Sequence, residues 1–139
     1  MSTTTATETE RIARDYFDRV WNHGDIDRSV LAADYRVHLH LGGVETHTLD
    51  EFAHHLEAMR DAVPDLHKEI EDVVATDDRV VVRYTMTGTQ EGEFRDVPGT
   101  GDAIETGAVA IYRFEGEQIA EAWIVADFLR VLRQLGVVD

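Results

Sequence analysis

The sequence contains no cysteine, a single lysine (Lys68) and only two prolines among its 139 residues. Without cysteine the chain forms no disulfide and offers no thiolate for catalysis or metal binding. No stretch approaches the roughly 18 consecutive apolar residues of a membrane-spanning helix, so we expect no membrane partner. The first ten residues, MSTTTATETE, lack the basic and apolar regions of a signal peptide, which predicts a cytoplasmic protein.

Positively charged residues are also scarce: the chain has 13 basic and 28 acidic residues, which gives a net charge of −15. The acidic residues are spread through segments that are also rich in hydrophobic side chains, which indicates a folded domain with an acidic surface. Such a surface repels nucleic acid, so we expect no nucleic-acid partner. Excess carboxylate with almost no lysine is typical of halophilic cytoplasm; an ordinary acidic bacterial protein is the alternative.

The hydrophobic period changes from helical to alternating along the chain, which predicts an α+β fold. After a disordered lead-in over residues 1–7, we expect one domain over 8–137. Its predicted elements are a helix over 8–22, a short helix over 26–32, a strand over 34–41, a helix from Thr48 or Asp50 to Ala62, hairpins turning at Asp77-Asp78 and at Glu115-Gly116, and a final helix. We expect a curved, mostly antiparallel sheet wrapped around the helices as a cone, with a central pocket.

The second hairpin places Asp127 next to this pocket if Glu115 and Gly116 are its central turn residues. Strand alternation then gives one face to the following residues: Ala110, Tyr112, Glu121, Trp123, Val125 and Asp127. We interpret this face as a pocket wall with Asp127 at its end, either as a catalytic acid/base, as the N-cap of the final helix, or as both. The opposite face, which carries Ile124 and three alanines (Ala120, Ala122 and Ala126), predicts a homodimer surface.

Several further side chains are candidates for the pocket. His38 and His40 share one strand face, either as hydrogen-bond donors to a ligand or as structural residues; no third ligand is evident, so we predict no metal site. Four core residues are candidate ligand contacts: Trp21, Phe52, Met59 and Tyr84. Arg83 alternates with Tyr84, and the sequence leaves open which of the two faces the core.

Six motifs, in order and over nearly the whole chain, closely resemble the SnoaL-like polyketide cyclase family of the nuclear-transport-factor-like superfamily. They are WNHGD (21–25), DYRVH (34–38), VPDLHKEIEDVVATDDRVVVRYTMTGTQEGEF (63–94), VPGTG (97–101), TGAVAIYRFEGEQIAEAW (106–123) and DFLRVLRQLG (127–136). Some cyclases of the family carry histidine where this chain has Ala110 or Gln90.

The resemblance implies a cone-shaped α+β barrel with a pocket between the sheet and the helices. It also implies that Asp127 is the general acid/base of an aldol-type closure of a polyketide ester, without metal or organic cofactor. We therefore expect an enzyme that acts on a small apolar or aromatic carbonyl compound or ester, with His38 or Tyr84 steadying the enolate. The alternative is a domain that binds a small ligand, or a protein partner, without catalysis.

Overall fold

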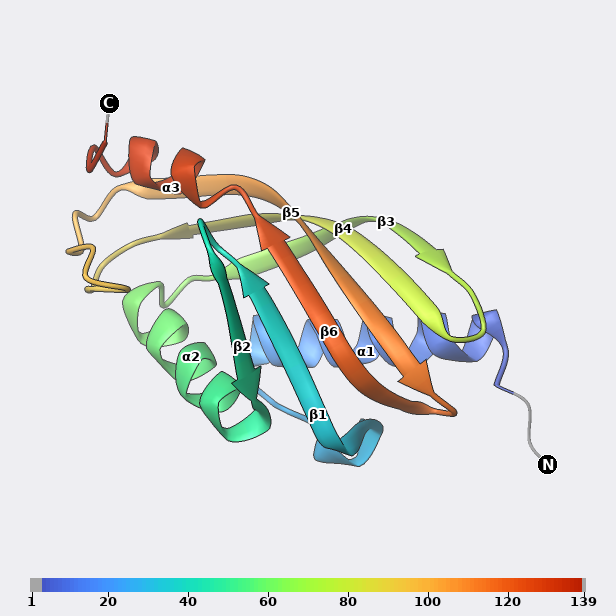
Figure 1. Ribbon diagram of the computed structural model, residues 1–139. Helices are drawn as coiled ribbons and strands as arrows, with labels where there is room; N and C mark the ends of the chain where they lie inside the picture. Colours follow the sequence, from blue (N-terminus) through green and yellow to red (C-terminus); the bar gives the residue numbers. More distant parts are fainter. Residues whose placement is uncertain (1–3, 139) are drawn as a thin grey trace.

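The structure, a computed structural model, describes residues 4–138 and contains one open sheet of six strands (Figure 1). The helices are α1 (Ala6–His23), α2 (Leu49–Ala62) and α3 (Phe128–Gln134), with a 3-10 turn over Arg28–Val30; the strands are β1 (Leu31–His40), β2 (Val44–Thr48), β3 (His67–Ala75), β4 (Arg79–Thr89), β5 (Ala103–Glu115) and β6 (Gln118–Ala126). The strand order is β2-β1-β6-β5-β4-β3. Only β1 and β6 pair in parallel; the other neighbours are antiparallel.

The helices cover the inner face of the curved sheet. Figure 1 shows α1 crossing behind the strands, while α2 and α3 lie toward one end of the sheet. Helix α1 packs against β3 and β4, α2 against β1 and β2, and α3 against β5. The predicted α+β fold with a curved, mostly antiparallel sheet is confirmed. Within the described residues, no helix is long and apolar enough to span a membrane.

Capping residues decide where the two long helices begin. The Thr5 hydroxyl accepts a hydrogen bond from the Glu8 amide, and the Glu8 carboxylate accepts one from the Thr5 amide. This capping box starts α1 at Ala6, so the helix includes the last two residues of the predicted lead-in over 1–7; residues 1–3 lie outside the described part of the chain. The same pair of bonds joins Thr48 and Glu51, which makes Thr48 the N-cap of α2.

Two features of the sheet were not predicted. Strand β2 is a short, polar edge strand, VETHT, with few apolar residues to mark it. It follows β1 through a turn in which Gly42 adopts a positive φ of 89°. The parallel pairing of β1 with β6 joins segments far apart in the sequence, and no local turn chemistry records it.

A β-bulge in β6 decides which side chains face the core. Phe114 pairs with Ile119, but the next residue, Arg113, pairs with Glu121, so Ala120 is an extra residue on β6. One extra residue moves every later side chain to the other face of the strand. Beyond Ala120, our predicted face assignment for this strand is therefore wrong.

As a result, β6 turns its small and aliphatic side chains inward. Ala122 and Ile124 are buried, while Val125 is 47% exposed. Glu121 and Trp123 lie on the outer face of the sheet with Val125, opposite the helices. The homodimer surface that we predicted around Ile124 is thus part of the core.

Candidate functional site

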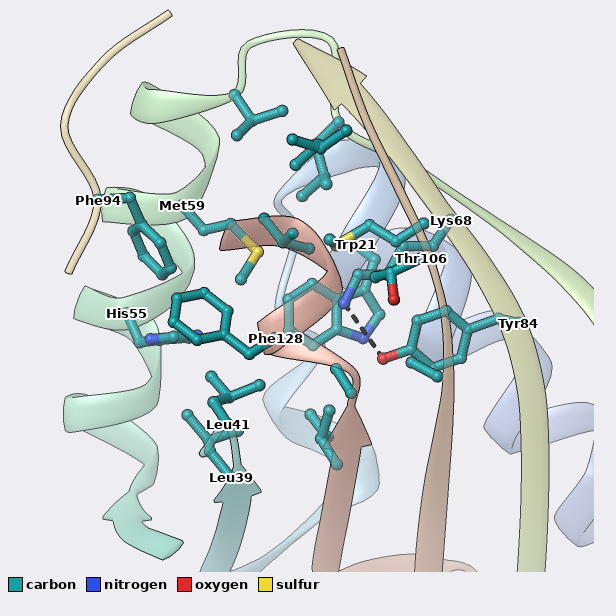
Figure 2. A pocket seen from close by; sticks show the side chains of 18 of the residues that line it. Trp21, Leu39, Leu41, His55, Met59, Lys68, Tyr84, Phe94, Thr106 and Phe128 are labelled. Atoms are coloured by element: carbon teal, nitrogen blue, oxygen red, sulfur yellow. Dashed lines mark hydrogen bonds between the residues drawn. The ribbon is translucent and has the colours of Figure 1, made fainter. Parts of the chain in front are cut away.

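One apolar cavity of about 50 Å³ lies between the inner face of the sheet, α2, α3 and the loop over residues 90–102. Figure 2 shows side chains from all of these elements converging on it. Its lining residues are Trp21, Leu39, Leu41, His55, Met59, Val63, Leu66, Lys68, Tyr84, Met86, Gln90, Phe94, Ile104, Thr106, Ala108, Ile124, Ala126, Phe128 and Val131. Most of these side chains are hydrocarbon, so an occupant must be small and mainly apolar.

Lys68, the only lysine of the chain, is the most unusual residue in this lining (Figure 2). Lys68 is buried, with only 4% of its surface exposed. The Nζ atom lies 3.2 Å from the ring centroid of Trp21 and donates a hydrogen bond of 3.5 Å to the Tyr84 hydroxyl. Among the described residues, no carboxylate lies within ion-pair distance of Nζ. A lysine in this position lacks the partner that buried charges normally have.

Two opposing effects act on the charge of Lys68. Contact with the indole face of Trp21 favours the ammonium ion by about 2 kcal/mol when both groups are desolvated. Full burial without a counter-ion disfavours the ammonium ion, because the apolar surroundings replace the water that solvates its charge. Burial is the larger effect, and it lowers the pKa of Lys68 well below its ordinary value of 10.5. We therefore expect a largely neutral amine inside the cavity.

The other titratable groups of the cavity are held neutral by the same cause. Burial raises the pKa of Tyr84, so its phenol stays protonated. Burial, together with the nearby positive charge of Arg95, lowers the pKa of His55 to about 4, so its imidazole is neutral at pH 7. The cavity thus offers an amine, a phenol and an imidazole as hydrogen-bonding groups without a fixed charge.

Two polar side chains of the cavity lining, Gln90 and Thr106, donate hydrogen bonds to backbone carbonyls. The buried side chain of Gln90 donates a hydrogen bond of 3.1 Å to the Val97 carbonyl and so fixes the loop beside the cavity. The Thr106 hydroxyl donates to the Asp127 carbonyl over 3.3 Å. Gln90 and Ala110 are the two positions where some cyclases of the family carry histidine. Gln90 lines the cavity, whereas Ala110 is fully buried and does not line it.

Three of the predicted ligand contacts do line the cavity: Trp21, Met59 and Tyr84. Phe52 and Tyr112 are buried next to it in the core; Phe52 packs edge-on against Trp21 with ring centroids 5.6 Å apart. Arg83 is exposed on the outer face of β4, so Tyr84, the next residue, is the one that faces the core.

The predictions that the remaining candidates face the pocket are wrong, because the bulge and the register of β1 place them on the outer face of the sheet. These residues are His38, His40, Glu121, Trp123 and Val125. His38 Nε2 lies 2.6 Å from a Glu121 carboxylate oxygen, and its ring stacks on Trp123. The hydrogen bond from His38, together with one from Arg113, lowers the pKa of Glu121.

Asp127 is the N-cap of α3. Its side chain is exposed and accepts a hydrogen bond of 3.0 Å from the Arg130 amide. The prediction that its carboxylate shares a pocket wall with Trp123 and Val125 is wrong for the same reason of register. Its two neighbours in sequence, Ala126 and Phe128, do line the cavity, so the Asp127 backbone lies at the cavity edge.

Sequence reasoning missed Lys68, although the strand pattern carried a signal for it. Leu66 and Lys68 are buried, whereas His67 and Glu69 between and after them are exposed. Alternation of period two therefore assigns Lys68 to the inner face. The rarity of lysine in a chain that otherwise uses arginine also distinguishes this position.

Comparisons with known proteins agree with this architecture. The profile of the family described as SnoaL-like polyketide cyclase matches residues 11–135. AclR, a candidate hydroxylase from Streptomyces galilaeus, is 25% identical and superposes with a TM-score of 0.83 over 97% of this chain and 100% of its own. IdmH, a candidate polyketide cyclase from Streptomyces antibioticus, is also 25% identical, with a TM-score of 0.79 over 92% of this chain and 98% of its own.

A third solved structure, a candidate SnoaL-like cyclase from Jannaschia sp., shares the fold with a TM-score of 0.84 at 22% identity, over 100% of this chain and 98% of its own. No curated protein sequence is detectably similar to the chain. Because the family profile spans most of the 139 residues, the chain belongs to the SnoaL-like polyketide cyclase family.

Proposed function

We propose that the cavity binds a small apolar carbonyl compound and that the protein moves a proton at the carbon next to the carbonyl. The observation that carries this proposal is the apolar cavity in which the Lys68 amine lies beside the Tyr84 phenol, and in which burial disfavours the charged form of both groups. A neutral carbonyl oxygen suits such a site, because it accepts hydrogen bonds without bringing a charge into an apolar environment. Tyr84 is the donor that would steady an enolate oxygen.

The size of the cavity limits the substrate. The space open to the centre of a water-sized molecule is about 50 Å³, several times the roughly 10–15 Å³ that a single buried water needs. Only a molecule of a few heavy atoms fits without movement of the lining. A larger ester would need the flexible side chains of Met59 and Met86 to change rotamer.

Asp127 is the proposed acid/base, as the family resemblance implies. For this role its carboxylate must leave the Arg130 amide and turn past Phe128 toward the cavity. Loss of an N-cap hydrogen bond costs about 1 kcal/mol, which is small beside an enzymatic barrier. The motion is therefore compatible with catalysis.

The capping bond of Asp127 also favours a second candidate function, a domain that binds a small ligand without turning it over. In that case the carboxylate only stabilises α3, and the cavity serves for binding alone. The two functions differ in whether the ligand exchanges its α-protons.

Proton exchange distinguishes them. We would incubate the protein with butanone in deuterated buffer and follow loss of the α-proton signals by nuclear magnetic resonance. The enzyme proposal predicts exchange above the buffer rate, and predicts that Asp127→Asn folds normally but loses most of it, because asparagine keeps a capping oxygen without shuttling a proton. Binding of butanone without exchange would leave the binding function in its place.

A further inference from the structure

We propose that Lys68 captures short-chain aldehydes and ketones covalently, by forming an imine between its Nζ atom and the carbonyl carbon inside the cavity. This inference rests on the proposed carbonyl site and adds a nucleophile to it. It assigns a chemical role to the one lysine of the chain.

The geometry places the amine where a ligand must lie. Nζ sits between the indole of Trp21, 3.2 Å from the ring centroid, and the Tyr84 hydroxyl at 3.5 Å, and all three residues line the same cavity (Figure 2). A carbonyl group in this space contacts Nζ directly. In the part of the chain that the structure describes, no carboxylate pairs with Nζ to hold it as an ammonium ion.

Nucleophilic attack requires the lone pair of a neutral amine. Burial lowers the pKa of Lys68, which supports a neutral amine at neutral pH. The titratable groups that face it are Tyr84 from β4 and His55 from α2, and neither contributes a negative charge that would restore the ammonium ion. Lysines desolvated in apolar pockets are activated in this way for Schiff-base chemistry.

The reaction balances without any further reagent. The Lys68 nitrogen forms a bond to the carbonyl carbon, and the electron pair of the C=O π bond moves to oxygen. One proton passes from nitrogen to that oxygen to give a carbinolamine; the Tyr84 hydroxyl, beside Nζ, is placed to relay it. The C–O bond then breaks, the oxygen leaves as water with the second amine proton, and the C=N bond forms.

The surroundings favour the imine once it has formed. Hydrolysis needs water, and the cavity of about 50 Å³ has little room for water when a ligand is present. The same volume restricts the carbonyl partner to a short carbon chain. Butanal, with five heavy atoms, is therefore a suitable probe.

Reductive trapping tests the proposal directly. We would incubate the protein with butanal and cyanoborohydride at pH 7 and locate the butyl adduct by peptide mass spectrometry. Since Lys68 is the only lysine, the α-amino group is the only other primary amine and serves as an internal reference. The same reaction in urea, where the chain is unfolded, gives the rate at which Lys68 is trapped when it behaves as an ordinary exposed lysine.

An ordinary lysine is neutral in roughly 1 of 2,500 molecules at pH 7. We expect Lys68 to be trapped at least about tenfold faster in the folded protein than in urea, relative to the α-amino group. Slower trapping in the folded protein overturns the proposal.

Cavity occupancy separates this failure from failure of the proposed function. In Trp123→Phe, the fluorescence of Trp21 reports cavity occupancy. If butanal changes that fluorescence but does not label Lys68, the imine is wrong and the carbonyl site remains. If neither signal appears, both are wrong. Lys68→Met should bind butanal reversibly and show no adduct beyond the α-amino group.

Discussion

Replacing Lys68 by methionine should stabilise the protein at neutral pH. Methionine has a similar length and brings no charge into the cavity. Burial lowers the pKa of folded Lys68 well below the ordinary value of 10.5, so between these two pKa values the unfolded chain binds a proton that the folded chain does not. Each unit by which the folded pKa lies below that value subtracts about 1.4 kcal/mol from the free energy of unfolding at lower pH.

Because burial lowers the folded pKa of Lys68 well below its ordinary value, Lys68→Met should be more stable than the wild type at pH 7, by about 1.4 kcal/mol for each pH unit between the two pKa values. Folded domains have total stabilities of about 5–15 kcal/mol, so this difference is easily measured. The direction of the Lys68 pKa shift also determines how the stability of the protein depends on pH. The folded pKa is lowered, so wild-type stability rises with pH between the folded pKa and about 10.5, and the advantage of the variant shrinks along the same interval.

Urea unfolding at pH 7, 8 and 9 provides the assay. The range stops below pH 10 because burial raises the pKa of Tyr84 and Tyr112, and unfolded tyrosines that ionise there reverse the slope. Arg83→Met is the matched control, since it removes one exposed positive charge from β4 without a change in burial. Equal stability of wild type and Lys68→Met at every pH would show that Lys68 is charged in the folded protein and would refute the reasoning.

Three other predictions follow from the structure. Glu45 forms an ion pair with Arg95, the neighbour of the cavity-lining Phe94. Glu45→Gln should therefore loosen the loop over residues 90–102 and speed ligand release in stopped-flow measurements. An unchanged release rate would show that this ion pair does not hold the loop closed over the cavity. The homodimer was predicted through the face around Ile124, which is buried, so we now place this prediction on the outer face of the sheet, where Val125 is 47% exposed. Trp123→Glu should then sediment as a folded monomer, and a monomeric wild type would contradict the prediction. With a net charge of −15, the melting temperature should be several degrees higher in molar KCl than in dilute buffer, and equal melting temperatures would contradict the halophile interpretation.

Two predicted details differ from the structure: the second hairpin turns at Gly116-Glu117 rather than at Glu115-Gly116, and the short helix predicted over 26–32 is a 3-10 turn over Arg28–Val30. The periodicity of the sequence predicted the other helices, both strand pairs and the curved sheet, because these depend on local patterns and turn residues. It could not predict the bulge at Ala120, since counting along a strand assumes that no residue is inserted. That single residue exchanged the inner and outer faces of β6 and moved Trp123 away from the pocket. The inward position of Lys68 was predictable from alternation, but the consequence of its burial depends on the absence of a nearby carboxylate, which only the three-dimensional structure reveals.

The central claim is that the cavity next to Lys68 binds a small apolar carbonyl compound, and Trp21 provides the most direct measurement. The chain has two tryptophans, and only Trp21 lines the cavity, so Trp123→Phe leaves one reporter. Titration of this variant with butanone should change its fluorescence saturably, and Ala108→Phe, which fills the cavity, should abolish the change while the protein stays folded. An identical, unsaturable response in both variants would contradict the account.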